Sequence, residues 1–296
     1  MKTIDKPKMQ RYTLRDFEQQ FPNDDVCLDW LKDYLYPDGI FCDKCQQITN
    51  HFRVASRKSY SCQTCGHHVH PTAGTIYHKS STPLRLWFYA VYLMASTRCG
   101  ISAKQIEREI GVTYKTAWRM FHQIRSMLDE SGKKLGNEVE VDETYIGGYH
   151  KGKTGRGSEN KTIVVGAVER KGSVVAKVAN NVKAETLIPF INETIEQNSM
   201  VYTDELRSYN SVKYQGYDHQ RVRHSAKAYV IGNAHTNSIE GFWSLLKGGL
   251  RGVYKGRITR KHLQNYVNEF AFRYNRRNDT EPMFLSFLGQ VQKSCD

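Results

Sequence analysis

A chain of 296 residues, 39% of them hydrophobic and 11% aromatic, is long enough for two or three domains and apolar enough to exclude wholesale disorder. Its 43 Lys and Arg residues against 30 Asp and Glu give a formal net charge of +13, which indicates a polyanionic partner, with nucleic acid the first candidate. No stretch approaches the roughly 18 consecutive apolar residues of a membrane span, and the first eight residues lack the apolar run of a secretion signal, so we expect a cytoplasmic, nucleoid-associated protein without a membrane partner.

The first 40 residues predict a small helical segment without chemistry of its own. Residues 13–36 show two short helical patterns, with Thr13 suited to cap the first and Asn23 or Asp24 the second. In the second helix, apolar residues recur at steps of three and four and form one predicted packing face: Cys27, Trp30, Leu31, Tyr34 and Leu35. We therefore expect residues 1–40 to be a packing module.

Two Cys-x-x-Cys pairs, separated by sixteen residues, dominate the next segment, residues 41–80. This spacing predicts a zinc ribbon, in which one tetrahedral Zn²⁺ is held by four thiolates: Cys42, Cys45, Cys62 and Cys65. The residues between the pairs are too poor in apolar groups to form a core, so the metal must supply the folding free energy. A redox role is the competing interpretation, but it needs only one pair and a βαβ context.

Residues 81–130 carry the pattern of a helix-turn-helix region. Apolar residues line one face of a helix from Leu84 onward, residues 101–110 predict a second helix, and Gly111 ends it before Thr113, which is suited to cap a third. The third helix presents side chains near its start, where recognition helices meet base edges and phosphates: Tyr114, Lys115, Thr116 and Arg119. We interpret them as DNA contacts; the alternative is a helical hairpin with solvated charges.

A short acidic strand, residues 139–148, stands out in this basic chain. Alternation divides its side chains between two faces, with Val139, Val141 and Glu143 on one and Glu140, Asp142 and Thr144 on the other. A carboxylate such as Asp142 between valines is costly unless a cation neutralises it, and a divalent metal ion is the usual cation. The alternative is an acidic strand edge at the surface. Only the rest of the chain decides between this alternative and a metal site.

The next elements predict a mixed sheet. In order, the patterns are those of two β-branched strands, an amphipathic helix and a further strand: residues 162–168, 173–178, 184–197 and 200–204. Three strands, a helix and a strand, with Asp142 on the first strand and Asp204 at the tip of the fourth, is the order expected of an RNase H-like sheet. The predicted fold class is therefore α+β or α/β and multidomain, with helices flanking this sheet.

A helix predicted over residues 235–247 offers a third metal ligand. Side chains recur on one of its sides at steps of three and four: Asn237, Glu240, Ser244 and Lys247. The opposite side is expected to face the sheet through Phe242, Leu245 and Leu246. Carboxylates on neighbouring strands and on this helix can hold two Mg²⁺ about 3.5–4 Å apart. Taken alone, the spacing from Glu240 to Lys247 along the helix is more often that of a solvated helix face.

Basic residues gather in a glycine-rich loop and around the last helix, residues 259–274. The cations that we expect to hold DNA phosphates are Lys151, Lys153 and Arg156 in the loop, Arg251 and Arg257 before the helix, Arg273 at its end and Arg276 after it. A solvated charged surface is the alternative for both groups.

The motif around Glu240 resembles that of a known protein family. His-x-Asn-x-x-Glu-Gly-Phe-Trp-Ser-x-Leu-Lys from His235, followed by Tyr-Val-Asn-Glu-Phe-Ala-Phe-Arg-Tyr-Asn-Arg-Arg from Tyr266, is similar to the signature of bacterial insertion-sequence transposases with an N-terminal zinc ribbon and a DDE catalytic domain. The stretches around Asp142 and Asp204 match the first two catalytic motifs of this family. The resemblance spans nearly the whole chain.

The resemblance implies metal-dependent cleavage at the ends of a mobile element, followed by strand transfer into target DNA. It assigns Asp142 and Asp204 as ligands of Mg²⁺ or Mn²⁺. Both Glu240 and Asn237 are candidates for the third ligand. We choose Glu240 because an ionised carboxylate suits a hard cation and because Lys247 lies at the seven-residue offset expected of the family's basic residue, and we keep Asn237 as a supporting or substitute ligand.

We therefore predict a DNA transposase, with residues 138–277 as its RNase H-like catalytic domain and residues 278–296 as a C-terminal tail. It is expected to act on double-stranded DNA, both element ends and target, as a homodimer or higher oligomer, because two ends must be joined. One alternative is an RNase H-like nuclease or resolvase that cuts without joining. The other is a DNA-binding regulator with a broken acidic triad, against which the three carboxylates count.

Overall fold

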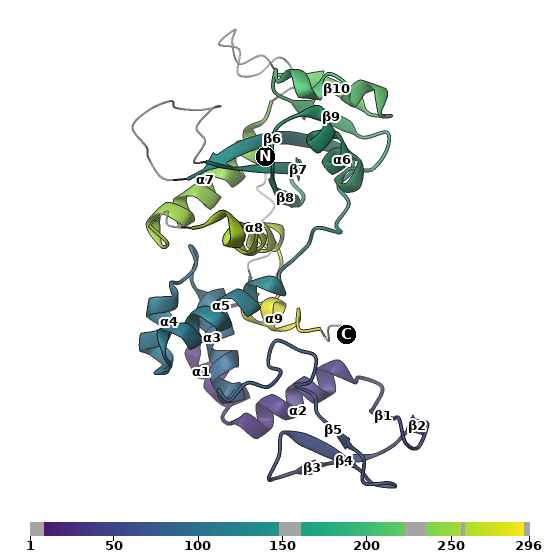
Figure 1. Cartoon of the computed structure of the whole chain (residues 1–296), viewed down its shortest axis with the longest axis vertical. Coiled ribbons are helices and arrows are strands. Elements are labelled where there is room, and N and C mark those ends of the chain that lie inside the picture. Colours follow the sequence, from purple (N-terminus) through teal and green to yellow (C-terminus); the bar gives the residue numbers. More distant parts are fainter. Residues whose placement is uncertain (1–8, 148–160, 223–234, 256–257, 293–296) are drawn as a thin grey trace, which may run out of the picture. The chain divides into compact units, whose positions relative to one another are not determined.

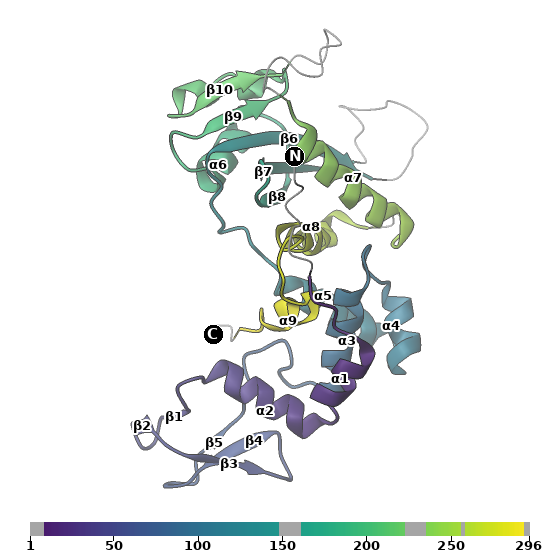
Figure 2. The same cartoon turned by 180° about the vertical axis from the view of Figure 1, so that it is seen from behind.

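The computed structural model describes residues 9–147, 161–222, 235–255 and 258–292, and it divides into two units (Figures 1 and 2). The first is formed within residues 1–127 and 279–296, and the second within residues 128–278. Four cations of the predicted DNA contacts lie outside the described residues: Lys151, Lys153, Arg156 and Arg257. In the described part of the chain, no helix combines the length and the apolar character that crossing a membrane requires.

Two capped helices begin the first unit, α1 (Leu14–Gln20) and α2 (Asp24–Leu35). Side-chain oxygens of Thr13 and Asn23 accept hydrogen bonds from backbone N–H groups of the first turns, as predicted. The buried residues of α2 are Cys27, Leu28 and Leu31. The predicted packing face is wrong at Tyr34, which is 41% exposed, because α2 turns its Leu28 side inward instead.

Five short strands follow: β1 (Phe41–Cys42), β2 (Gln47–Ile48), β3 (His51–Val54), β4 (Ser59–Cys62) and β5 (His68–Val69). β1 and β2 form one antiparallel hairpin, and β3, β4 and β5 form an antiparallel sheet. Each Cys-x-x-Cys pair begins on the last residue of a strand and continues into the following turn, at Cys42 and at Cys62. Two hairpin turns thereby present all four thiols.

Three helices complete the pattern predicted after the ribbon: α3 (Leu84–Ser96), α4 (Ala103–Ile110) and α5 (Tyr114–Ser126). Gly111 adopts a left-handed conformation with φ of 70°, which lets the chain leave α4 sharply. The Thr113 hydroxyl then caps α5 by accepting from the N–H of Thr116. α4 and α5 therefore form the expected helix, glycine-containing turn and helix.

The last segment of the chain corrects one expectation. Residues 278–296, predicted to be a tail, include a helix, α9 (Met283–Leu288), which belongs to the first unit. Its Phe284, Phe287 and Leu288 are buried, and the ring of Phe284 lies 5.8 Å from that of Phe17 in α1. The apolar side chains of this helix thus complete a core whose other parts are far away in sequence.

The second unit is built on a mixed five-stranded sheet: β6 (Glu138–Ile146), β7 (Thr162–Glu169), β8 (Val174–Ala179), β9 (Met200–Thr203) and β10 (Asp218–Arg221). Their order across the sheet is β10-β9-β6-β7-β8. β6, β7 and β8 are antiparallel neighbours, whereas β9 and β10 run parallel to β6. This confirms the predicted RNase H-like mixed sheet. β10 was not predicted, because its Asp-His-Gln-Arg sequence has no apolar alternation.

Two apolar layers enclose this sheet (Figures 1 and 2). On one face, Val141 and Val165 pack against α6 (Ala184–Thr194) and against the short 3-10 helices η1 (Arg207–Tyr209) and η2 (Val212–Tyr214). On the other, Val164 and Val168 pack against α7 (Asn237–Gly252) and α8 (Arg260–Asn275). Strand alternation therefore decides which side chains of β6 meet α7.

Candidate active site

Asp142 lies on the α7 side of β6, where one glycine makes room for its partner. The residue opposite Asp142 on β7 is Gly166, and a Cβ atom there would lie 2.6 Å from the ring of Trp243. With no side chain in the way, the Trp243 indole packs over β7, and its Nε1–H donates to Asp142 Oδ2 at 3.0 Å. The orientation of Asp142 is thus set by a buried α7 residue.

Asp204 meets Asp142 because their strands are parallel neighbours. Val141 pairs with Thr203, so the residues that follow them lie next to each other, Asp142 in the middle of β6 and Asp204 just beyond the end of β9. Asp204 Oδ1 also accepts from the N–H of Leu206 at 2.8 Å, which holds the side chain at the strand end. The predicted meeting of these two aspartates is present in the structure.

Glu143 is a third member of this acidic group, which sequence reasoning missed. Carboxylate oxygens of Asp142, Glu143 and Asp204 all lie within 4.8 Å of one another. Alternation places Glu143 on the other face of β6, but its buried carboxylate still reaches the group beyond the end of β9 and accepts from the Tyr209 hydroxyl at 3.0 Å. The two consecutive acids on this strand, Asp142 and Glu143, are the sequence feature that could have indicated it.

Burial and mutual repulsion shape the electrostatics of this acidic group. Burial, followed by the charges of Glu143 and Asp204, raises the pKa of Asp142 to about 7. Burial also raises the pKa of Tyr209 well above its usual value, so the phenol stays protonated and donates. Oxygen donors this close, with one carboxyl reluctant to ionise, fit a hard divalent cation. The group thus has the chemistry of a metal site.

The structure does not bring Glu240 into the acidic group. Glu240 and Asn237 are exposed near the start of α7, and Glu240 Oε1 accepts from the Thr236 hydroxyl at 2.9 Å. Phe242 and Leu246 face the sheet as predicted, whereas Leu245 is 58% exposed. The expectation for Leu245 is wrong because the helix is rotated so that Trp243 packs inward.

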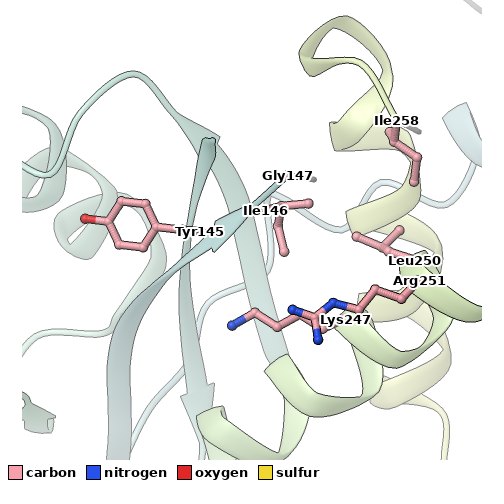
Figure 3. Close-up of a pocket in the computed structure, with 7 residues that line it drawn as sticks. All are labelled: Tyr145, Ile146, Gly147, Lys247, Leu250, Arg251 and Ile258. Carbon is pink, nitrogen blue, oxygen red and sulfur yellow. The ribbon is translucent and has the colours of Figure 1, made fainter. Parts of the chain in front are cut away.

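Lys247 and Arg251 form a cationic margin beside the acidic group. They line a small pocket at the end of β6 together with Tyr145, Ile146, Gly147, Leu250 and Ile258. Figure 3 shows both cationic side chains reaching from α7 toward β6, while the ring of Tyr145 points away from them. Burial, and then the charge of Arg251, lowers the pKa of Lys247. Among the described residues, neither cation has an ion-pair partner.

A fully buried carboxylate anchors α7, and sequence reasoning gave it no role. Glu140 Oε2 accepts from the backbone N–H groups of Ser238 and Ile239, at 2.8 and 3.1 Å, in the first turn of the helix. Its other oxygen accepts from Arg170 Nε at 2.9 Å and lies 3.2 Å from His235 Nδ1. Because Glu140 is two residues from Asp142, it ties the start of α7 to the catalytic strand.

The four predicted zinc ligands also meet. Sulfur atoms of Cys42, Cys45, Cys62 and Cys65 lie within 4.8 Å of one another, with 3.5 Å between Cys42 and Cys65 and 3.9 Å between Cys45 and Cys62. Thiolates 2.3 Å from one zinc ion would be about 3.8 Å apart. The Thr49 hydroxyl, 3.1 Å from Cys62 Sγ, is the main cause that lowers the pKa of Cys62 to about 5. This donor set fits zinc.

The predicted DNA contacts divide into two kinds. On α5, Tyr114, Lys115 and Arg119 are exposed and Thr116 is half-buried beside the cap. By contrast, Arg273 donates to the buried Glu269 at 2.9 Å, and Arg276 donates to Glu130 at 2.7 Å. Both arginines therefore have carboxylate partners within the unit, and their phosphate-binding role stays a prediction.

Comparisons with known proteins agree with this site. The ISXO2-like transposase domain matches residues 134–275, and the transposase zinc-ribbon domain matches residues 22–68. The fold, the acidic group and the ribbon define a DDE-type transposase. More specifically, the chain belongs to the family of ISXO2-like transposases.

Two curated relatives are similar to long parts of the chain. A protein from Halobacterium salinarum, described as an uncharacterized protein in transposable element ISH50, is 30% identical over 253 residues, which cover 77% of this chain and 85% of the relative. An uncharacterized transposase-like protein from Haemophilus influenzae is 32% identical over 123 residues, 42% of this chain and 96% of the relative.

Two solved structures share a distant likeness. The catalytic core of BIV integrase has a TM-score of 0.34 and 17% identity, and the match covers 52% of this chain and 94% of the integrase chain. The Mos1 strand transfer complex has a TM-score of 0.29 and 8% identity, with 68% and 76% covered.

Proposed function

We propose that this protein cleaves phosphodiester bonds at the ends of a mobile DNA element and transfers the freed 3′-hydroxyl to target DNA, using Mg²⁺ or Mn²⁺. The observation that carries the proposal is the meeting of the Asp142 and Asp204 carboxylates, from adjacent parallel strands, within 4.8 Å. When bound, such cations supply the charge that activates an attacking oxygen and stabilises a leaving one. No protein base is therefore required.

The chain's own residues hold and orient the donor atoms. Asp142 and Asp204 are the proposed ligands, and Trp243 keeps one Asp142 oxygen in place through its hydrogen bond. Tyr209 does the same for Glu143 from the opposite face of the sheet. Both donors are buried, so they fix the carboxylates without exposing the group to additional water.

The third ligand is proposed to be Glu240, with Asn237 as its substitute. Glu240 precedes Trp243, the donor to Asp142, by three residues on α7, so the two share one side of the helix, and the Glu240 side chain is exposed. We expect Glu240→Gln to remove metal-dependent cleavage and Glu143→Gln only to slow it. The reverse result would move the ligand role to Glu143.

DNA is the proposed partner on both units. Lys247 and Arg251 would hold phosphates beside the acidic group, and the exposed start of α5 around Lys115 would contact the element end. Zn²⁺ at the ribbon is assigned a structural role, because the site has four thiols and leaves no open position. Joining two ends requires two active sites, so we propose a homodimer or a higher assembly that acts on nucleoid DNA.

The test is cleavage of DNA that carries the two element ends, followed by strand transfer from pre-cut ends, with purified Asp142→Asn and Asp204→Asn proteins. Both variants are expected to bind DNA and to lose cleavage and joining. Glu193→Gln, an exposed carboxylate change on α6, is the matched control and should retain both activities. Cleavage by either aspartate variant would refute the assignment, and cleavage without joining by the unmodified protein would indicate a nuclease.

A further inference from the structure

A second cavity in the catalytic unit lies beyond Asp204, between η2 and β10. It has a volume of about 500 Å³, within the usual range of ligand pockets, and its lining is polar and basic: Asn210, Lys213, Tyr214, His219 and Arg221. We propose that this cavity binds one nucleotide of an unpaired DNA strand next to the scissile phosphate. The proposal rests on the function proposed above, and it adds a binding site for the substrate.

The register of the sheet places this cavity beside the catalytic carboxylates. β6, β9 and β10 are parallel, and β9 and β10 end in the same row, beside the middle of β6; the C-terminal ends of parallel strands are where α/β sheets bind their ligands. Val141, Thr203 and Arg221 lie in one row across these strands, and the next row holds Asp142 and Asp204. Arg221 is thus one strand, about 4.8 Å, beyond Thr203, the residue that precedes Asp204.

Cationic side chains lie on both sides of the acidic group. On the β10 side the acidic group is followed by Arg221 and Lys213, and on the α7 side by Lys247 and Arg251. A nucleic acid strand whose scissile phosphate sits at the acidic group needs cations on both sides, because its neighbouring phosphates extend both ways. The arrangement fits a strand that crosses the edge from α7 to β10.

The cavity also offers a stacking surface for a base. Tyr214 is 75% exposed, the largest exposure among the large hydrophobic side chains of the described residues, and the Lys213 ammonium lies 4.7 Å from its ring centroid. Exposed aromatic rings beside cations are how proteins bind unpaired bases without reading their sequence. A duplex would keep its bases stacked within the helix and leave such a ring without a partner.

Hydrogen bonds hold the cavity wall firmly against the catalytic strand. Arg221 Nη2 donates to the Glu205 carbonyl at 2.6 Å. The Thr203 hydroxyl donates to the Asp204 carbonyl at 3.0 Å and lies 2.9 Å from His219 Nε2. Since that hydroxyl has a single proton, His219 Nε2 must be the donor to it, and Nδ1 is the acceptor. The wall is therefore tied to both residues that follow β9.

The experiment measures binding of a fluorescent oligothymidylate of about 15 nucleotides, and of a blunt duplex of equal length, to the full chain without divalent metal. Tyr214→Ala is expected to weaken binding of the single strand about 5-fold to 100-fold and to leave duplex binding within about 2-fold, whereas Tyr214→Phe keeps both. Lys213→Gln and Arg221→Gln should each flatten the salt dependence of single-strand binding by nearly one charge.

Lys177→Gln, on the opposite edge strand β8, removes the same charge and should change neither affinity. Unchanged single-strand binding by Tyr214→Ala, or an equal loss for strand and duplex, would overturn the proposal. Because the assay requires no catalysis, such a failure leaves the Asp142→Asn cleavage result untouched. Loss of cleavage activity alone would in turn leave this binding result standing.

Discussion

At the scale of single residues, Asp142 links the chemistry of the site to the stability of its unit. Its carboxyl has a folded-state pKa of about 7, against about 3.9 in an unfolded chain. The folded protein therefore keeps a proton that the unfolded chain releases as the pH rises from about 4 to 7. Without metal, the free energy of unfolding must fall across this window, by at most about 4 kcal/mol.

We expect the metal-free protein to be less stable near pH 8 than near pH 5, and Asp142→Asn to reduce this difference. Urea unfolding of both proteins in metal-free buffer measures the effect, with Mg²⁺ at pH 8 expected to restore stability only to the unmodified protein. Equal pH dependence in the two proteins would show that the carboxyl does not carry the shift.

Glu140 is the second residue whose effect depends on burial. It is fully buried and joins Arg170 to the first turn of α7, so Glu140→Ala removes one carboxylate partner of the half-buried Arg170 and leaves two N–H groups without their acceptor. We expect a loss of about 3–5 kcal/mol of unfolding free energy. Glu138→Gln removes a partly exposed partner of the same arginine and should cost less than about 1 kcal/mol. Denaturant unfolding of both variants measures the two losses of unfolding free energy, and equal losses would contradict this role of Glu140.

At the scale of elements, the position of α7 depends on one of two neighbouring glycines, Gly249 and not Gly248. A Cβ atom on Gly249 would lie 2.1 Å from the Phe270 ring of α8, whereas one on Gly248 would meet nothing within 4 Å. The close approach of α7 and α8 thus requires glycine at one position only. Because α7 carries Trp243 and Lys247, the distance between these helices also decides where the side chains of the site lie.

Gly249→Ala is expected to destabilise the catalytic unit by about 1–3 kcal/mol through overpacking. Gly248→Ala should stabilise it by up to about 1 kcal/mol, because alanine favours the helix. Thermal unfolding of the two variants gives the comparison directly. The same sign for both would mean that the contact between α7 and α8 is looser than these distances indicate.

At the scale of the whole molecule, segments from early and late in the sequence pack together in the first unit. Phe284 of α9 is 2% exposed and packs against the rings of Tyr12 and Phe17, nearly the whole chain away in sequence. Phe284→Ala is expected to cost the first unit about 3–5 kcal/mol and to spare the catalytic unit. Leu245→Ala, at an exposed position, is the control. Amide hydrogen exchange read separately over α3 and β7 distinguishes the two units.

By itself, the sequence determined those features whose cause is local. The spacing of Cys42, Cys45, Cys62 and Cys65 predicts a metal ribbon because hairpin turns bring such pairs together. The caps at Thr13, Asn23 and Thr113 satisfy N–H groups only three residues away, so they are visible without a fold. Asp142 and Asp204 were predicted together because Asp142 lies between valines on one predicted strand and Asp204 directly follows another.

Only the tertiary structure decided features that depend on pairing between distant segments. Glu143 joins the acidic group, and Glu140 anchors α7, because β6, β9 and the helix converge there. Arg273 and Arg276 are neutralised by Glu269 and Glu130, which a pattern of charges cannot show. The polar strand β10 is held by backbone pairing with β9 and not by an apolar face, so alternation of apolar residues does not reveal it or its cavity. Burial and hydrogen bonding across the sheet, which periodicity does not record, select these partners.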